Sequence, residues 1–408
     1  MAEPVLVAGG GIGGAAAALA LARAGFDVRL FEARPDPAEA GAGLQIGANG
    51  MKALRHLGLE AAVLEAATRP ERLELRLPGS GRVVGRVAFG AAHAARYGAP
   101  YVHLHRADLH RAIFEAAKSH PRIAVELGRR VVRAAQTPDE TSVELEGGGA
   151  AAGAALIGAD GVRSALRVGV AGEDAPVFTG MTAWRAVVPA SEADLARPPV
   201  ATVWMGRGRH LVTYPLTARR EINLIGVVEE KPEIEESWSA PGTSADMAAD
   251  FGGWHAETDA LLARVTTPWR WPLYERHPLS VWSAGRIALL GDACHAMPPF
   301  LAQGACMALE DAVVLARRME ARRDDAARAL RDYGEARRER TARVQRPRGR
   351  TPGGSMCVIR RCAPSSMADW PSSARSRLPV PAGCMTGFTA TIRWRPDPLV
   401  PAIRFPRR

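Results

Sequence analysis

The chain has 408 residues, enough for two or three domains, and its 47% apolar and 24% charged residues are typical of a folded protein, not of a disordered or collagen-like chain. The net charge of +10 does not favour a nucleic-acid or membrane partner, because residues 341–408 carry 13 Lys and Arg against 2 Asp and Glu, whereas residues 1–340 carry 40 against 41. The five cysteines lack the spacing of disulfides or zinc ligands and no secretory signal is visible, so we expect no metal site and a reducing, cytoplasmic location.

The first predicted element is a short apolar strand at Val5–Ala8. The three glycines of a GxGxxG pattern follow it: Gly9, Gly11 and Gly14. An alanine-rich helix then runs to Ala24, and its N-terminus would face the phosphates of a bound nucleotide. A second strand, Asp27–Phe31, ends at Glu32, where a carboxylate can accept hydrogen bonds from an adenosine ribose. Together these features predict dinucleotide binding.

Two further features precede the middle of the chain. The runs Arg72–Leu77 and Arg82–Val87, joined by Pro-Gly-Ser-Gly, predict a β-hairpin. A strand-like run, Ala155–Ile157, leads into the sequence GADGVRS, in which Asp160 occupies the turn. An Asp-Gly turn at a strand end is common, and by itself Asp160 could simply cap that turn.

Residues 166–279 change to runs that alternate between apolar and polar residues, and these predict an antiparallel sheet with one buried face. The predicted strands are Met181–Val188, Ala201–Met205, His210–Pro215 and Ile222–Val228. His210 and Tyr214 are four residues apart on one strand, so both side chains point to the same face. A histidine with a neighbouring phenol can relay a proton, although the two side chains could equally be packing residues.

The third motif follows a predicted strand at Ile287–Leu290. Its sequence is GDACH, then a Pro-Pro pair, then Gln-Gly-Ala at the start of a predicted helix, Ala305–Met319. Asp292 at the strand end can bind the hydroxyls of a ribityl chain, and Gly304 at the helix N-terminus can present backbone N–H groups to the edge of a flavin ring.

The GxGxxG turn with Glu32, GADGVRS and GDACHAMPPFLAQGACMALEDA together resemble the single-component FAD-dependent aromatic hydroxylases, and within them the salicylate and 6-hydroxynicotinate hydroxylases, from Val5 to about Gln345. The resemblance implies an α/β fold like that of p-hydroxybenzoate hydroxylase. A Rossmann-like FAD-binding domain would comprise residues 1–165 and 280–345, and an inserted, mostly antiparallel β-sheet substrate domain would comprise residues 166–279.

The resemblance also assigns site residues. The cofactor-binding residues it implies are Gly9, Gly11, Gly14, Glu32, Arg106, Val131, Asp160, Asp292, Gly304 and Ala305. Arg106, in HRADLH, would reach the ribityl or phosphate portion of FAD, and Val131 would line the adenine pocket. His210 and Tyr214 would be catalytic. Gln45 stands where the hydroxynicotinate enzyme has a histidine at its substrate site, and Arg185 is a candidate for holding a carboxylate.

The function implied is hydroxylation of a (hydroxy)aromatic acid with O2, with NAD(P)H as a transient reductant, through a flavin C4a-hydroperoxide. The expected partners are therefore a small aromatic substrate and O2, with no nucleic acid and no membrane, and a homodimer stays open. Three alternatives remain at this stage: a flavin oxygenase acting on a larger polycyclic or antibiotic substrate, an FAD-binding protein inactivated by an altered C-terminus, and a nucleic-acid-binding role of the basic tail.

The last segment differs in composition, since residues 346–408 contain 10 of the 30 prolines and little periodicity. One interpretation is a disordered basic tail. Another is a frameshift near residues 345–355, because back-translation of CMTGFTAT at residues 384–391 in another register permits His-Asp-Trp-Leu-Tyr-Gly-Tyr-Asp, which resembles the ending of related hydroxylases. We favour the frameshift, which sequencing the 3′ end of the gene would test.

Overall fold

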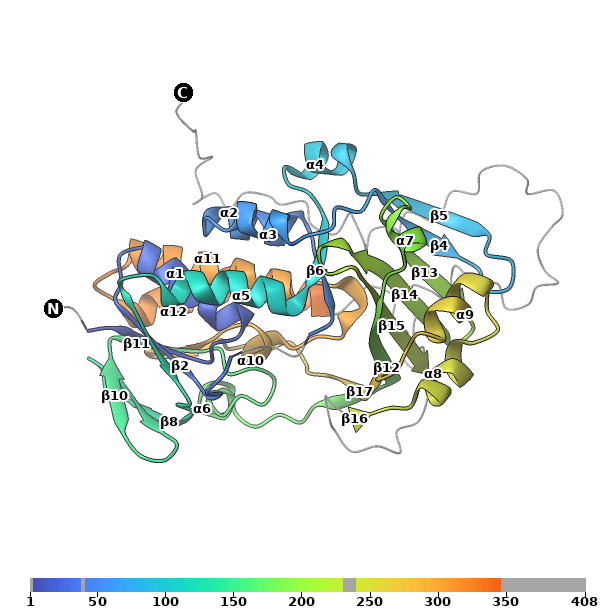
Figure 1. Ribbon diagram of the computed structural model, residues 1–408. Coiled ribbons are helices and arrows are strands. Elements are labelled where there is room, and N and C mark those ends of the chain that lie inside the picture. The colour runs from blue at the N-terminus through green and yellow to red at the C-terminus, as the bar shows by residue number, and fades with distance from the viewer. Residues whose placement is uncertain (1–2, 38–40, 230–239, 346–408) are drawn as a thin grey trace, which may run out of the picture.

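The computed structural model describes residues 3–37, 41–229 and 240–345 (Figure 1). The basic tail and the expected frameshift lie outside these residues. Within them, two large sheets stand side by side, one covered by long helices and the other carrying two short helices on its far side (Figure 1). The expected α/β class, with a second, mostly antiparallel sheet, is confirmed.

The first sheet has six strands and is parallel except at one edge. Its strands, in spatial order, are β18 (Ser283–Ala284), β19 (Ile287–Leu289), β11 (Ala155–Gly158), β1 (Val5–Ala8), β2 (Val28–Glu32) and β7 (Ile123–Leu127). Only the β18–β19 pair is antiparallel. The central strands are short apolar runs that are buried along their whole length, as parallel strands covered on both faces require.

Long helices cover one face of this sheet, as Figure 1 shows. They are α1 (Ile12–Arg23), α5 (Arg106–Lys118), α11 (Gly304–Ala321) and α12 (Ala326–Gln345). The other face carries the small sheet of β8 (Val131–Gln136), β9 (Thr141–Leu145) and β10 (Ala150–Gly153), together with α6 (Leu166–Ala171). Strand β1 leads directly into the N-terminus of α1, and α11 follows β19 after a short connection.

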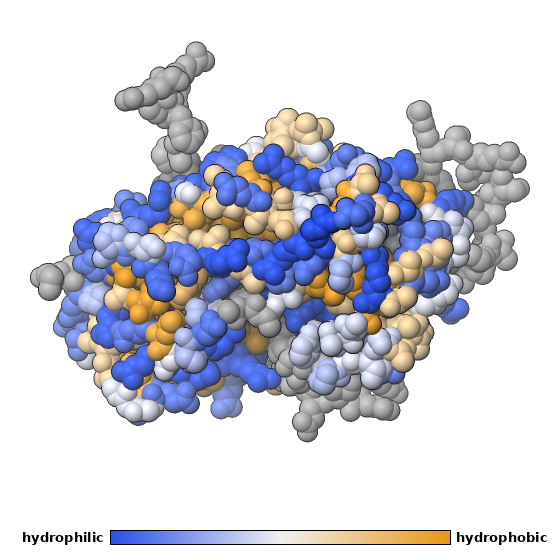
Figure 2. Space-filling model, viewed as in Figure 1, coloured by the Kyte–Doolittle hydropathy of each residue, from blue (hydrophilic) through white to orange (hydrophobic). Residues whose placement is uncertain are grey.

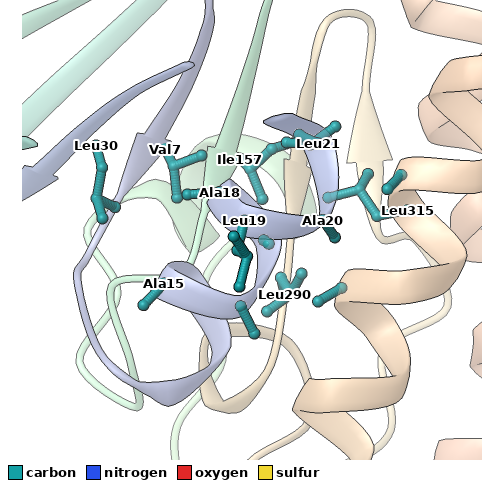
Figure 3. Close-up of a cluster of buried hydrophobic side chains, with 14 of the residues drawn as sticks. Val7, Ala15, Ala18, Leu19, Ala20, Leu21, Leu30, Ile157, Leu290 and Leu315 are labelled. Carbon is teal, nitrogen blue, oxygen red and sulfur yellow. The ribbon is translucent and has the colours of Figure 1, made fainter. Parts of the chain in front are cut away.

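Alanine side chains allow α1 to lie close to both the sheet and α11 (Figure 3). Figure 3 shows Ala18 of α1 beside Val7 of the sheet, with Leu290 on another side of the same helix, and all three are at most 1% exposed. Helix α12 closes this core, because Tyr333 is fully buried and its hydroxyl donates a hydrogen bond to the Leu289 carbonyl oxygen.

The second sheet has eight strands. In spatial order they are β16 (Ala240–Pro241), β17 (Trp269–Glu275), β12 (Val177–Pro189), β15 (Glu221–Glu229), β14 (Arg209–Leu216), β13 (Val200–Gly206), β4 (Arg72–Arg76) and β5 (Val83–Ala88). All neighbours are antiparallel except β13 and β4. The predicted hairpin at residues 72–87 forms and extends one edge of this sheet, as expected.

The two faces of the eight-stranded sheet have different partners. The outer face packs against α8 (Ser244–Phe251) and α9 (Ala256–Leu262) through Trp184, Trp204 and other apolar side chains. The opposite face, which we call the inner face, carries His210 and Tyr214 and looks toward the six-stranded sheet. Period-two alternation thus places Trp184 outside and its neighbour Arg185 on the inner face.

A two-stranded sheet lies between the two large ones. It pairs β3 (Gly43–Ile46) with β6 (Val102–His105), and β6 contacts β14 of the eight-stranded sheet. Shorter helices are α2 (Ala48–His56), α3 (Glu60–Glu65), α4 (Ala91–Tyr97) and α7 (Glu192–Leu195). A further short helix, α10 (Asp292–His295), follows β19. The β3–β6 sheet is therefore the element that joins the cofactor side of the molecule to the inner face.

Hydrophilic side chains cover most of the face seen in Figure 2, with hydrophobic ones in small groups. Among the described residues, no helix is both long and apolar enough to cross a membrane.

Candidate functional site

The glycine turn between β1 and α1 leaves room for a ligand at the start of the helix. Gly9 has a φ of +102°, and a Cβ atom there would lie 2.4 Å from the Ala159 carbonyl oxygen. A Cβ on Gly14 would lie 1.8 Å from the Gly9 carbonyl oxygen. In contrast, a Cβ on Gly11, the N-cap of α1, would meet nothing within 4 Å, and no side chain caps the helix. The first-turn N–H groups therefore face open space and can bind a phosphate.

Glu32 lies at the carboxyl end of β2, beside this turn. Its carboxylate accepts hydrogen bonds from the Gly10 N–H (2.7 Å) and the Arg34 N–H (2.9 Å), and the residue is 8% exposed. These two bonds leave acceptor positions for the hydroxyls of a ribose. The Arg129 N–H donates to the Glu32 carbonyl oxygen, which brings the start of β8, and with it the buried Val131, close to the same strand end.

Asp160 lies at the neighbouring strand end, after β11. One carboxylate oxygen accepts hydrogen bonds from the Ala165 and Leu166 N–H groups, at 2.9 and 3.4 Å. The other, Oδ1, is buried with no hydrogen-bond partner in the described residues, and burial raises the pKa of the carboxyl group. Asp160 thus caps the following turn with one oxygen, and the unpartnered oxygen keeps the prediction of a cofactor contact open.

Asp292 follows the third strand end, where Gly291 turns the chain with a φ of +63°. The Asp292 carboxylate is exposed, and its Oδ1 lies 4.0 Å from the position of a Cβ atom on Gly304. Gly304 and Ala305 begin α11, which has no side-chain cap at its N-terminus. A free carboxylate and free helix N–H groups thus lie together at this strand end.

Arg106, at the start of α5, and Arg185, on β12 of the eight-stranded sheet, interact electrostatically. Arg106 begins α5, and its N–H donates to the Ala42 carbonyl oxygen at 2.9 Å. Arg185 lies on the inner face with its guanidinium carbon 5.4 Å from the centroid of the Trp271 ring. Burial, and then the charge of Arg106, lowers the pKa of Arg185. Arg185 has no acidic partner within the described residues, so this region is electropositive.

His210 and Tyr214 lie on the same face of β14, as predicted, but they do not form a pair. At a rise of about 3.3 Å per residue, their Cα atoms are about 13 Å apart, too far for a direct proton relay. The histidine beside Tyr214 is His103 of β6, with ring centroids 4.4 Å apart. Burial lowers the pKa of His210 to about 4 and raises the pKa of Tyr214, so both are neutral near pH 7. A direct proton transfer from one of these side chains to the other does not fit this geometry, and their catalytic roles stay predictions.

Sequence reasoning did not single out His103 and Asn223. Both side chains are fully buried where the β3–β6 sheet meets the inner face. The Asn223 side-chain oxygen accepts a hydrogen bond from the Gly43 N–H at 2.7 Å. One feature of the sequence could have indicated His103: it alternates with apolar residues in VHLH, whose last histidine begins the HRADLH motif. No comparable signal marks Asn223, which is one polar residue in an apolar strand.

His295, in the GDACH motif, is buried against charged side chains of α11 and α12. Its Nε2 atom lies 2.6 Å from an Asp311 oxygen, and Arg337 of α12 donates to the other oxygen at 2.7 Å. Both His295 and Asp311 are at most 1% exposed. No group of His, Cys, Asp and Glu residues in the described chain could hold a metal ion.

The family model described as FAD binding domain matches residues 2–347. The chain is 39% identical to a 6-hydroxynicotinate 3-monooxygenase of Bordetella bronchiseptica over 346 residues, which cover 84% of this chain and 89% of that protein. It is 37% identical to a 3-hydroxybenzoate 6-hydroxylase of Polaromonas naphthalenivorans over 343 residues, covering 84% and 85%. The structure of HpxO from Klebsiella pneumoniae, complexed with FAD and uric acid, is similar with a TM-score of 0.75 and 31% identity, covering 84% of this chain and 86% of that one.

Proposed function

The chain belongs to the single-component FAD-dependent aromatic hydroxylases, and on this premise we propose that it hydroxylates a (hydroxy)aromatic acid with NAD(P)H and O2. The observation that carries the substrate class is Arg185, a half-buried cation without an acidic partner in the described residues, on the same sheet face as His210 and Tyr214. A guanidinium in such surroundings is a strong and geometrically specific binder of a carboxylate.

The residues at the three strand ends fit FAD. The open N-terminus of α1 at Gly11 suits the pyrophosphate, and Glu32 suits the adenosine ribose. We assign the unpartnered oxygen of Asp160 and the exposed carboxylate of Asp292 to polar groups of the flavin half. The start of α11 at Gly304 and Ala305 would contact the isoalloxazine edge. When bound, FAD supplies the activation of O2 for transfer of one oxygen atom to the ring.

The remaining polar side chains suit binding and orientation. Arg185, supported by Trp271, would hold the substrate carboxylate, and Arg106 would add positive charge on the cofactor side. The neutral phenol of Tyr214 can donate or accept a hydrogen bond with the substrate, and the neutral imidazole of His210 would face the ring from the same strand. The apolar side chains of the inner face, such as Val203 and Val227, would exclude water from the reacting ring.

We also propose the division into residues 1–165, 166–279 and 280–345, a cytoplasmic location and a homodimer. Two buried free cysteines support a reducing compartment, because Cys294 and Cys306 are fully buried and burial raises the pKa of the Cys306 thiol to about 12. Sedimentation of the purified holoenzyme would test the homodimer.

Two measurements test the proposed function. The absorption spectrum of the purified chain, with the released chromophore identified, should show flavin bands from FAD. The holoenzyme should then consume NADH or NADPH together with O2 when 3-hydroxybenzoate or 6-hydroxynicotinate is added, and mass spectrometry should detect a product heavier by one oxygen atom. Stoichiometric FAD with no stimulated consumption by any aromatic acid would contradict the proposal.

A further inference from the structure

Four polar side chains meet where the β3–β6 sheet lies against the inner face. Gln45 and His103 are paired across β3 and β6, and Tyr214 and Asn223 are paired across β14 and β15. The rings of His103 and Tyr214 are 4.4 Å apart with an interplanar angle of 42°. A Cβ on Gly43 would lie 2.7 Å from the Tyr214 hydroxyl oxygen and 2.8 Å from Asn223 Cγ, so these two side chains also converge.

Hydrogen bonds account for only part of this cluster. Gln45 accepts from the Tyr101 hydroxyl at 2.7 Å, and Asn223 accepts from the Gly43 N–H at 2.7 Å. Both ring nitrogens of His103, the Tyr214 hydroxyl and the Asn223 amide nitrogen have no partner in the part of the chain that the structure describes. These three side chains are at most 1% exposed. Because unpaired buried polar groups oppose folding, such a group of atoms is expected to bind a ligand or ordered water.

The unpartnered atoms have a definite chemical preference. Burial lowers the pKa of His103 to about 3 and raises that of Tyr214, so neither side chain is charged near pH 7. A neutral imidazole offers one donor and one acceptor, a phenol offers both, and the amide nitrogen offers donors. The complementary group is therefore neutral and both donates and accepts, as a ring hydroxyl or its lactam tautomer does. A carboxylate is better matched by the cationic Arg185.

The distance between the two binding groups suits a small aromatic acid. Arg185 pairs with Ile225, two residues from Asn223 on the adjacent strand. Such diagonal neighbours on one sheet face have Cα atoms about 7–8 Å apart. Arg185 and the Tyr214–Asn223 pair thus lie on the same sheet face, with backbone positions about one substituted ring apart and with His103 beside Tyr214.

Taking the proposed function as its premise, we propose that His103, with Tyr214 and Asn223, forms the subsite that binds the ring hydroxyl of the substrate. His103 then determines the preference for hydroxylated over non-hydroxylated aromatic acids. Its contribution is direct contact with the substrate hydroxyl, and the carboxylate end is bound independently.

The test compares the wild-type holoenzyme with His103→Leu and His103→Asn. Changes in flavin absorbance on titration report binding of 3-hydroxybenzoate against benzoate, and of 6-hydroxynicotinate against nicotinate. We expect the wild type to prefer the hydroxylated acid of each pair by about tenfold or more, since one net hydrogen bond corresponds to about that factor. His103→Leu should lose the preference while binding benzoate as before, and His103→Asn should keep part of it.

Thermal unfolding of the same samples separates this role from a structural one. Because His103 has no hydrogen-bond partner among the described residues, His103→Leu should unfold at the wild-type temperature or higher. His93→Leu is the matched control, since His93 is also buried with an unpartnered Nδ1 atom but lies in α4, and its preference should stay at the wild-type value.

A wild-type preference retained in His103→Leu would overturn the inference while the proposed function stands. Equal weakening of 3-hydroxybenzoate and benzoate would also overturn it, because that result indicates that only ordered water occupies the space. If the FAD-loaded wild type binds none of the four acids, both the inference and the proposed function are wrong. His103→Asn keeps the test decisive if the leucine variant does not fold.

Discussion

The strand ends of the six-stranded sheet and the inner face of the eight-stranded sheet both contribute to the candidate site, but with different parts of the chain. At the strand ends, backbone geometry prepares the site: Gly9 and Gly14 leave no room for a side chain, and helix N-termini stay uncapped. On the inner face, side chains such as Arg185, His210 and Tyr214 form the candidate site. A substitution should therefore abolish cofactor binding in the first region and change substrate binding in the second.

The largest effect is expected for Gly14→Val. A Cβ at this position would lie 1.8 Å from the Gly9 carbonyl oxygen, and backbone cannot move away without opening the turn between β1 and α1. The variant should purify without FAD or fail to fold, as measured by flavin absorbance and circular dichroism. Gly169→Ala is the control, because a Cβ there meets nothing within 4 Å in α6, and this variant should be yellow. A yellow Gly14→Val protein would contradict the assignment of the turn.

The second prediction concerns the contribution of a buried network of charged side chains to the stability of the cofactor side of the molecule. Arg337→Leu removes the α12 arginine that binds the fully buried Asp311 and also Glu310, whereas Arg340 of the same helix still binds Glu310. We expect a loss of about 3–5 kcal/mol in the free energy of unfolding, because the carboxylates stay buried with fewer partners. Urea unfolding measures it. Arg338→Leu, which removes only an exposed bond to the Ser280 carbonyl oxygen, should cost less than about 1 kcal/mol.

On the inner face, Arg185→Gln should raise the KM for 3-hydroxybenzoate by about 10–100-fold, the value of a charge-assisted hydrogen bond. Its FAD content should equal that of the wild type, because Arg185 belongs to the eight-stranded sheet. Steady-state kinetics and flavin absorbance provide both values. Arg209→Gln is the control, since Arg209 hydrogen-bonds to Asp250 on the outer side of the molecule, and its KM should not change. Equal KM values for the two variants would exclude Arg185 as the carboxylate ligand.

The smallest expected effect is a loss of folding stability at acidic pH. Burial lowers the pKa of His103 to about 3 and of His210 to about 4, below the value of about 6.5 in an unfolded chain. Between these values the unfolded chain binds more protons, so stability should fall as the pH decreases below about 6.5, by about 1 kcal/mol for each histidine at pH 5.5. Thermal unfolding at pH 5.5 and 7.5 measures this loss. A variant with both histidines replaced by leucine should lose less, and an equal loss would show that neither histidine causes the pH dependence.

The difference between the strand ends and the inner face also explains which parts of the candidate site could be predicted from the sequence. The turn at Gly9–Gly14, the acidic residue Glu32 and the strand-end residue Asp292 are each adjacent in sequence to the element that positions them, so short motifs sufficed. The alternation of residues 181–228 also predicted the antiparallel sheet and the common face of His210 and Tyr214. It did not reveal that the ring beside Tyr214 belongs to His103, which comes from another sheet.

His103 is the clearest example of a candidate site residue that the sequence did not predict. It is 111 residues from Tyr214 in the chain, and only the packing of β6 against β14 brings the two rings together. Asn223 is likewise an ordinary polar residue in sequence, until its hydrogen bond to Gly43 places it at the junction of two sheets.

Local sequence therefore determined the strand–turn–helix units, the cofactor class and the antiparallel character of the second sheet, because glycine conformation, helix N-termini and strand periodicity depend on neighbouring residues. Only the tertiary structure decided which side chains share the inner face with a substrate, because buried polar groups are brought together by the packing of strands that are distant in sequence. The unpartnered nitrogens of His103 are the clearest product of that packing.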